Sequence, residues 1–302
     1  MVFTQANITS FFEDNDQMGV PHDTYVQLQA EGIENVSDLA DFDKDSLHQL
    51  ADNLRRPGGR IPDPNPGAAA GATILTPPFA FGAKSQKRLL VACDIVRYYN
   101  TVGREFTVGN LKWTHVMKNF EIQWKALKGK KEDDQPEVPK IYKALPVIKW
   151  TEAFQDFLHR IIGVRLIPLA YVIREKVEVP AAAPPLATDQ PHSTLHGSVE
   201  AELVARASHG HPLYRDDNSA VYYALEEATR TTIYAASIKP FQRAKDGRGA
   251  WLAMIGQYAG EDKWQSEIKR QDDLLHTRQW KGQSNFSLES FIGQHWNMPL
   301  YR

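Results

Sequence analysis

The segment that decides the fold class is Asp246-Gly247-Arg248-Gly249-Ala250-Trp251-Leu252-Ala253-Met254-Ile255-Gly256-Gln257-Tyr258-Ala259-Gly260. Its large apolar residues recur at i, i+3, i+4 and i+7, so they line one face of a helix: Trp251, Met254, Ile255 and Tyr258. Asp246 is placed to cap the first turn, and Gly260 to end the helix in a left-handed conformation. The stripe carries no group suited to chemistry beyond the Trp and Tyr edges. It predicts burial against other helices, of this chain or of further copies of it.

Helical spacing recurs along the whole chain, and no segment shows convincing strand alternation, so the sequence predicts an all-α protein. Gly32 is placed to stop one of the early helices, and Gly163 a later one. The apolar residues 166–173 are expected to form, with the helix before them, the heart of a central domain. The predicted helices cover residues 8–12, 25–28, 36–42, 47–54, from 85 onward, 111–127, 150–161, 199–204, 221–235, 264–275 and 288–295.

The composition describes a soluble globular chain. Of the 302 residues 42% are hydrophobic and 24% charged, and no run approaches the roughly 18 apolar residues of a membrane helix. The N-terminus lacks the basic and apolar regions of a secretion signal. Cys93 is the only cysteine, which excludes a disulfide framework and a multi-cysteine zinc site. We therefore expect a cytoplasmic protein.

Charge and Pro/Gly content divide the chain into five parts. Residues 1–57 hold eleven acidic and three basic residues, a net charge of −8, and their short helices suggest a sterile-alpha-motif-like or helix-hairpin-helix-like module. The paired glycines of a DNA-binding hairpin are missing, and the negative charge repels phosphates, so a protein-interaction or structural module is favoured. The other parts are a linker (58–83), a central domain (84–179), a second linker (180–197) and a C-terminal helical domain (198–302).

The central domain contains the basic part of the chain. Residues 107–176 hold thirteen basic and eight acidic residues, a net charge of +5, which suits an acidic partner. The candidate RNA-binding residues are Lys125, Lys128, Lys130 and Lys131. The acidic run 132–134 follows directly, so the alternative is an exposed charged loop without a nucleic-acid role.

The sequence lacks the usual signatures of an enzyme: nucleophile elbow, Walker loop, His-Glu-x-x-His motif and EF-hand loop. Cys93 lies on an apolar helix face without a nearby histidine, which is typical of a buried core thiol. Four histidines gather around the second linker: His192, His196, His209 and His211. They lack a rigid element to orient them as zinc ligands, so we expect solvated histidines. We predict neither a catalytic nor a metal site, no cofactor, no membrane partner and no small-molecule substrate.

Three C-terminal motifs resemble the Gag proteins of copia-type LTR retrotransposons, especially the Gag-like proteins of diatoms. They are the helix Ala250-Trp251-Leu252-Ala253-Met254-Ile255-Gly256-Gln257-Tyr258, the segment Asp273-Leu274-Leu275-His276-Thr277-Arg278, and, after Gly282, Ser287-Leu288-Glu289-Ser290-Phe291-Ile292. The central Lys149-Trp150-Thr151-Glu152-Ala153-Phe154-Gln155-Asp156-Phe157-Leu158 is similar to the tryptophan helix that opens such Gag domains. The resemblance covers roughly residues 85–296 and is strongest over 212–296.

The resemblance implies a capsid-type helical protein that assembles with copies of itself around RNA. A single cysteine excludes the family's zinc knuckle, and the chain ends soon after Phe291-Ile292, so we expect a truncated or domesticated copy. The runner-up is a monomeric adaptor that binds a protein through residues 1–57. Apolar stripes form cores by default, so the assembly candidates are equally candidates for core packing: Trp150, Phe154, Phe157, Trp251, Ile255, Tyr258, Phe291 and Ile292.

Overall fold

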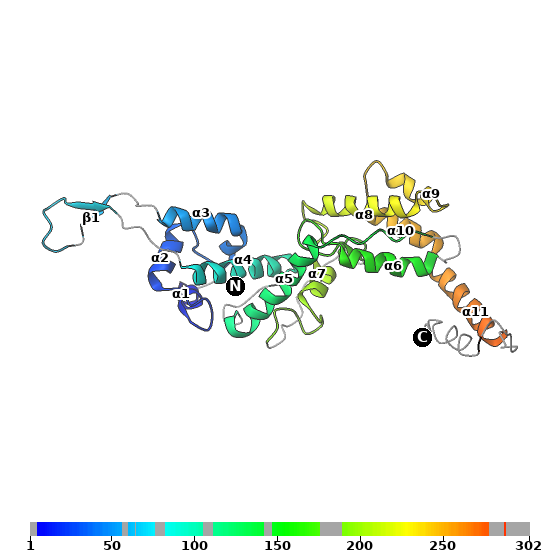
Figure 1. Cartoon of the computed structure of the whole chain (residues 1–302), viewed down its shortest axis with the longest axis horizontal. Helices are drawn as coiled ribbons and strands as arrows, with labels where there is room; N and C mark the ends of the chain where they lie inside the picture. The colour runs from blue at the N-terminus through cyan, green and yellow to red at the C-terminus, as the bar shows by residue number, and fades with distance from the viewer. Residues whose placement is uncertain are drawn as a thin grey trace. The chain divides into compact units, whose positions relative to one another are not determined.

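The computed structural model describes residues 5–55, 60–63, 65–75, 82–104, 111–141, 147–175, 189–277 and Ser287 (Figure 1). Over these ranges the chain is helical apart from a short hairpin, which confirms the all-α class. The chain divides into two compact units. Unit 1 comprises Met1–Asp134 and Ile162–Pro212, and unit 2 comprises Gln135–Ile161 and Leu213–Arg302.

The N-terminal helices lie where the sequence predicts them: α1 (Gln5–Glu13), α2 (His22–Ala30), the 3₁₀ helix η1 (Val36–Asp41) and α3 (Lys44–Arg55). Gly32 ends α2 as expected, with a left-handed φ of 93°. Its N–H donates to the Gln29 carbonyl (3.0 Å), and the next N–H, of Ile33, donates to Leu28 (3.0 Å). Leu28 and Ile33 are both fully buried, so the helix end is fixed by backbone bonds and an apolar contact together.

The N-terminal helices belong to the same compact unit as α4 (Ala83–Thr101). Arg88 Nη1 donates to the Met18 carbonyl (2.7 Å), and Arg97 Nη2 donates to the Phe42 carbonyl (2.8 Å). Cys93 of α4 is fully buried, which confirms the predicted core thiol, and burial raises its pKa to about 12. In the predicted linker between α3 and α4, strands β1 (Arg60–Pro62) and β2 (Thr73–Leu75) form an antiparallel hairpin that the sequence analysis missed.

The rest of unit 1 packs beside α4. A single π turn, η3 (Trp113–Met117), leads into α5 (Lys118–Glu132), and together they occupy the predicted helix 111–127. The 3₁₀ turn η4 (Leu169–Tyr171) and α7 (Val199–Arg206) complete the described part of the unit. Residues 166–173 therefore lie in unit 1, and their buried side chains include Ile167, Leu169 and Tyr171.

Unit 2 contains α6 (Val147–Arg160), α8 (Tyr214–Thr229), α9 (Ala235–Ile238), the 3₁₀ turn η5 (Lys239–Phe241), α10 (Gly247–Tyr258) and α11 (Glu261–Thr277). The helix predicted over 221–235 is present as α8, but its predicted end is wrong, because α8 ends at Thr229. Threonine hydroxyls bond the backbone there: Thr229 Oγ1 donates to Leu225 O (2.7 Å), and Thr232 Oγ1 donates to Thr229 O (2.8 Å). Such local bonds compete with helix continuation.

The start of α10 is docked against α8. Asp246 caps the helix as predicted, accepting from the Gly249 N–H (2.9 Å). Asn218 of α8 donates to Asp246 Oδ1 (3.1 Å) and accepts from the Arg248 N–H (2.8 Å). At Gly247 a Cβ atom would lie 2.5 Å from the Tyr222 backbone nitrogen of α8, so only glycine fits there. The prediction for the other end is wrong: α10 ends at Tyr258, and Gly260 is not left-handed.

Helix α6 shares its core with α10. The sequence analysis placed this helix in the central domain, paired with residues 166–173. In the structure the Trp150 and Phe154 rings stack in unit 2 (4.8 Å between centroids), and both lie beside Trp251 of α10 (6.3 and 5.5 Å). The Trp150 indole N–H donates to the Pro139 carbonyl (2.7 Å), which anchors the segment before α6 to the same unit.

Candidate functional site

The predicted RNA-binding lysines lie on α5, and each of Lys125, Lys128 and Lys130 hydrogen-bonds a carboxylate. Lys125 Nζ donates to Glu121 (2.8 Å) on the same helix, Lys128 Nζ to Asp94 (3.0 Å) of α4, and Lys130 Nζ to Glu200 (2.6 Å) of α7. Lys131 lies in the last turn of α5. The helix thus presents its lysines together, but with acidic partners that the sequence spacing did not reveal.

The lysines lie on the solvent side of these pairs. The exposed fractions are 69% for Lys125 against 12% for Glu121, 40% for Lys128 against 9% for Asp94, and 43% for Lys130 against 26% for Glu200. The ammonium groups therefore remain accessible to an anion, although each is paired with a carboxylate beneath it. Exposed ion pairs contribute only about 0–1 kcal/mol each, so a phosphate group can compete for the lysines.

A small apolar slot lies between α4 and α5, directly beside the lysines. Its volume is about 320 Å³, and it is lined by Lys87, Leu90, Val91, Asp94, Phe120, Glu121, Trp124, Lys125 and Lys128. The Phe120 and Trp124 rings stack at 5.2 Å. Two ion pairs between the helices flank it: Lys87 with Glu121 (3.2 Å), and Lys128 with Asp94 (3.0 Å). We refer to this cavity as the α4–α5 slot.

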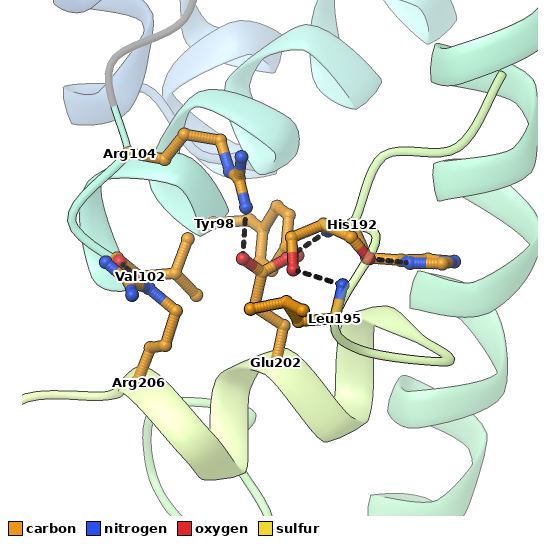
Figure 2. Close-up of polar contacts among 8 residues, drawn as sticks. Tyr98, Val102, Arg104, His192, Leu195, Glu202 and Arg206 are labelled. Atoms are coloured by element: carbon orange, nitrogen blue, oxygen red, sulfur yellow. Dashed lines mark hydrogen bonds and ion pairs between the residues drawn. The ribbon is translucent and has the colours of Figure 1, made fainter. Parts of the chain in front are cut away.

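A buried polar cluster joins α4, α7 and the segment before α7 (Figure 2). Glu202 is fully buried. Its carboxylate accepts from the Tyr98 hydroxyl (2.6 Å), from the Ser193 backbone N–H (2.9 Å) and from the Arg104 guanidinium, with which it forms an ion pair. Arg206, one turn after Glu202, donates from Nε to the Val102 carbonyl (2.7 Å). The cluster therefore fixes the end of α4 to α7.

The protonation states of this cluster favour its contacts between α4 and α7. Burial and the neighbouring Glu202 charge raise the pKa of Tyr98, so its hydroxyl stays protonated and donates to the carboxylate. Burial lowers the pKa of Arg206, and the charge of Glu202 opposes that effect. None of these residues was predicted as a site from the sequence. A signal did exist: Glu202 and Arg206 lie at helical spacing on the same face as the apolar Val199 and Leu203, and charged residues on a buried face usually have a partner.

The histidines around the second linker are placed by backbone contacts. The expectation of solvated histidines is wrong for His192, which is only 8% exposed and lies with Nδ1 3.0 Å from the Ser193 carbonyl. His209 lies with Nε2 2.8 Å from the Tyr171 carbonyl. Burial lowers the pKa of His196. Within the ranges described above, no group of three or more His, Cys, Asp or Glu side chains is placed to hold a metal ion, and this includes the four histidines.

The predicted assembly stripe is mostly core. Trp150, Phe154 and Trp251 are at most 4% exposed, and Phe157, at 9%, packs against Phe154 (5.8 Å between centroids). Ile255 and Tyr258 are half-buried, and Tyr258 meets Tyr234 edge-to-face at 4.7 Å. Phe291 and Ile292 lie outside the described residues. The aromatic stripe thus holds α6 and α10 together rather than facing solvent.

Other apolar residues of unit 2 do face solvent. Among its described side chains, Ile233 is 74% exposed, Tyr223 48%, Leu213 41% and Leu252 36%. Where the structure describes the chain, no helix combines the length and apolarity needed to cross a bilayer. Comparison with known proteins adds no relative, because the chain matches no protein-family profile, no curated protein sequence and no solved structure.

Proposed function

We propose that the protein is a non-enzymatic, self-assembling protein of the Gag-like capsid type that associates weakly with RNA. The observation that supports assembly most directly is the exposure of large apolar side chains in unit 2, with Ile233 at 74%. Covering such side chains with another subunit removes apolar surface from water, which stabilises the contact by about 25 cal/mol for each Å² buried. The all-α fold and the resemblance of 212–296 to copia-type Gag proteins support the same proposal.

Light scattering of the purified protein should show large oligomers, and electron microscopy should show particles. Ile233→Asp combined with Leu252→Glu should shift the protein toward the 34.2 kDa monomer, because a charge cannot be buried in an apolar contact without a partner. Ile122→Asp is the matched control, since Ile122 is 61% exposed but lies on unit 1. A single 34.2 kDa species of the unchanged protein would contradict assembly and favour the adaptor alternative.

RNA binding should be weak and salt-dependent. If the α5 lysines contact about two phosphates, the log–log slope of affinity against salt should be about −1.4 for single-stranded RNA. Replacing Lys125, Lys128, Lys130 and Lys131 together by Gln should abolish that slope, as measured by fluorescence anisotropy between low and high salt. Lys118→Gln, on the same helix and exposed, is the control. A slope that survives the fourfold substitution would remove these lysines from the interface.

The adaptor alternative meets one structural constraint. Because Arg88 and Arg97 of α4 bond the backbone of residues 18 and 42, the N-terminal helices form part of unit 1. A protein partner that binds residues 1–57 would thus bind a surface of the whole unit. The monomeric outcome of the scattering experiment is the result that would promote this alternative.

A further inference from the structure

The α4–α5 slot is flanked by two ion pairs, which set its length. The ion pairs Lys87–Glu121 and Asp94–Lys128 lie seven residues apart on each helix, about 10 Å at 1.5 Å per residue. Between them the lining is apolar, with Leu90, Val91 and Trp124. A slot of this length, flanked by ion pairs, matches the dimensions of a compact ligand.

The volume sets the size of the ligand. At about 320 Å³ the slot is roughly twice the size of an apolar cavity of about 150 Å³ that holds one benzene ring. A bicyclic ring system, or an acyl chain of similar bulk, therefore fills it. Small-molecule sites commonly have this character, with apolar and aromatic walls and a few charged groups at the edge.

The charged side chains at the edge of the slot indicate the charge of the ligand. Glu121 is shared by Lys125 (2.8 Å) and Lys87 (3.2 Å), whose side chains are 69% and 60% exposed. Asp94 is likewise shared by Lys128 (3.0 Å) and Arg97 (3.3 Å). Four cations thus surround two carboxylates, and the surplus of positive charge is most accessible at the Lys87–Lys125 end. Although burial opposes it, hydrogen bonds from Lys125 and Lys87 lower the pKa of Glu121, so this carboxylate remains charged between them.

We propose that the α4–α5 slot binds a compact apolar monocarboxylate, with its ring or acyl body between Leu90, Val91 and Trp124 and its carboxylate on Lys87 and Lys125. The ligand's carboxylate joins Glu121 as a second acceptor for the two ammonium groups. This site goes beyond the proposed assembly function and does not depend on it, because the slot lies within unit 1 and the assembly variants lie in unit 2.

The probe is 2-naphthoate, compared with the isosteric alcohol 2-naphthalenemethanol and the amine 2-naphthylmethylamine. Calorimetry should show saturable 1:1 binding of naphthoate. The affinity for naphthoate should be at least tenfold higher than the affinity for the alcohol, and the affinity for the amine should be the lowest. Saturation-transfer NMR, which tolerates large assemblies, should show contact along the ring. Lys125→Gln should weaken the binding of naphthoate at least fivefold and leave the binding of the alcohol unchanged. Lys118→Gln should change the affinity for neither ligand.

Val91→Phe fills the slot and should abolish binding of the whole series, with circular dichroism as the check on folding. Should that variant misfold, the ligand series and Lys125→Gln still decide the question. Absence of saturable naphthoate binding, equal affinity for naphthoate and its alcohol, or naphthoate binding that is unchanged in Lys125→Gln would each overturn the proposal. None of these results depends on whether the protein forms particles.

Discussion

Gly247→Ala should lower the free energy of unfolding of unit 2 by about 3 kcal/mol, the upper part of the range for overpacking a tight contact. The added Cβ would lie 2.5 Å from the Tyr222 backbone nitrogen and 2.8 Å from the Val221 Cβ, with the Asn218 carbonyl closer still. Backbone atoms of a helix cannot move aside cheaply, so α10 must lift off α8. Urea titration followed by tryptophan fluorescence measures the loss.

Gly256→Ala, on the same helix, is the matched control. A Cβ there meets nothing within 4 Å, and residue 256 is exposed. Alanine in an open helical position should stabilise the protein by about 0.5–1 kcal/mol. Opposite signs for the two substitutions would establish close packing at Gly247. Equal small effects would show that α8 and α10 do not approach as closely as described.

Glu202→Gln should cost about 3–5 kcal/mol, the range for breaking a buried ion pair by removing one partner. The amide has nearly the shape of the carboxylate, but it leaves the Arg104 guanidinium, 3% exposed, without its counter-charge. It also weakens the bond from the Tyr98 hydroxyl (2.6 Å) by removing the charge on the acceptor. Urea unfolding monitored by far-UV circular dichroism gives the difference from the unchanged protein.

Glu200→Gln lies two positions before Glu202 on α7 and is the control for charge alone. Its pair with Lys130 is 26% and 43% exposed, so we expect a change of about 0–1 kcal/mol. Combining Glu202→Leu with Arg104→Met should cost less than Glu202→Gln alone, because it removes the buried Arg104 charge together with its partner and leaves only the Arg206 charge in the cluster. A double variant that is less stable than Glu202→Gln would argue against an uncompensated Arg104 as the cause.

Local sequence patterns predicted most of the helices, because the signals that start and end a helix lie close together in the sequence. The stop at Gly32 and the cap at Asp246 depend on residues within four positions, which sequence displays directly. The break after Thr229 was missed because apolar spacing continued through Thr232 and Ala235. There the hydroxyl bonds of Thr229 and Thr232, not the apolar pattern, decided where the helix ends.

Long-range pairing was less predictable. The apolar stripe of α6 identified a buried face, but it could not specify whether residues 166–173 or Trp251 covers it. The lysines of α5 were identified as a cluster, yet the acidic partners Asp94 and Glu200 lie 34 and 70 positions away from the lysines they bond. Still longer separations, of 104 and 98 positions, kept the contacts of Glu202 with Tyr98 and Arg104 from being predicted. The charge count of residues 107–176 therefore left out two carboxylates that pair with lysines of this segment.

The order in which the chain builds its two units limits how it can be dissected. It passes from one unit to the other after residues 134, 161 and 212, so neither unit is one continuous stretch. A fragment spanning 198–302 would carry Trp251 without Trp150 and Phe154 of α6, and it would leave unit 1 without α7 and Glu202. Two recombinant fragments separated at the second linker would each expose apolar side chains that are buried in the whole chain. A circularly permuted or internally excised chain can instead keep all segments of one unit together.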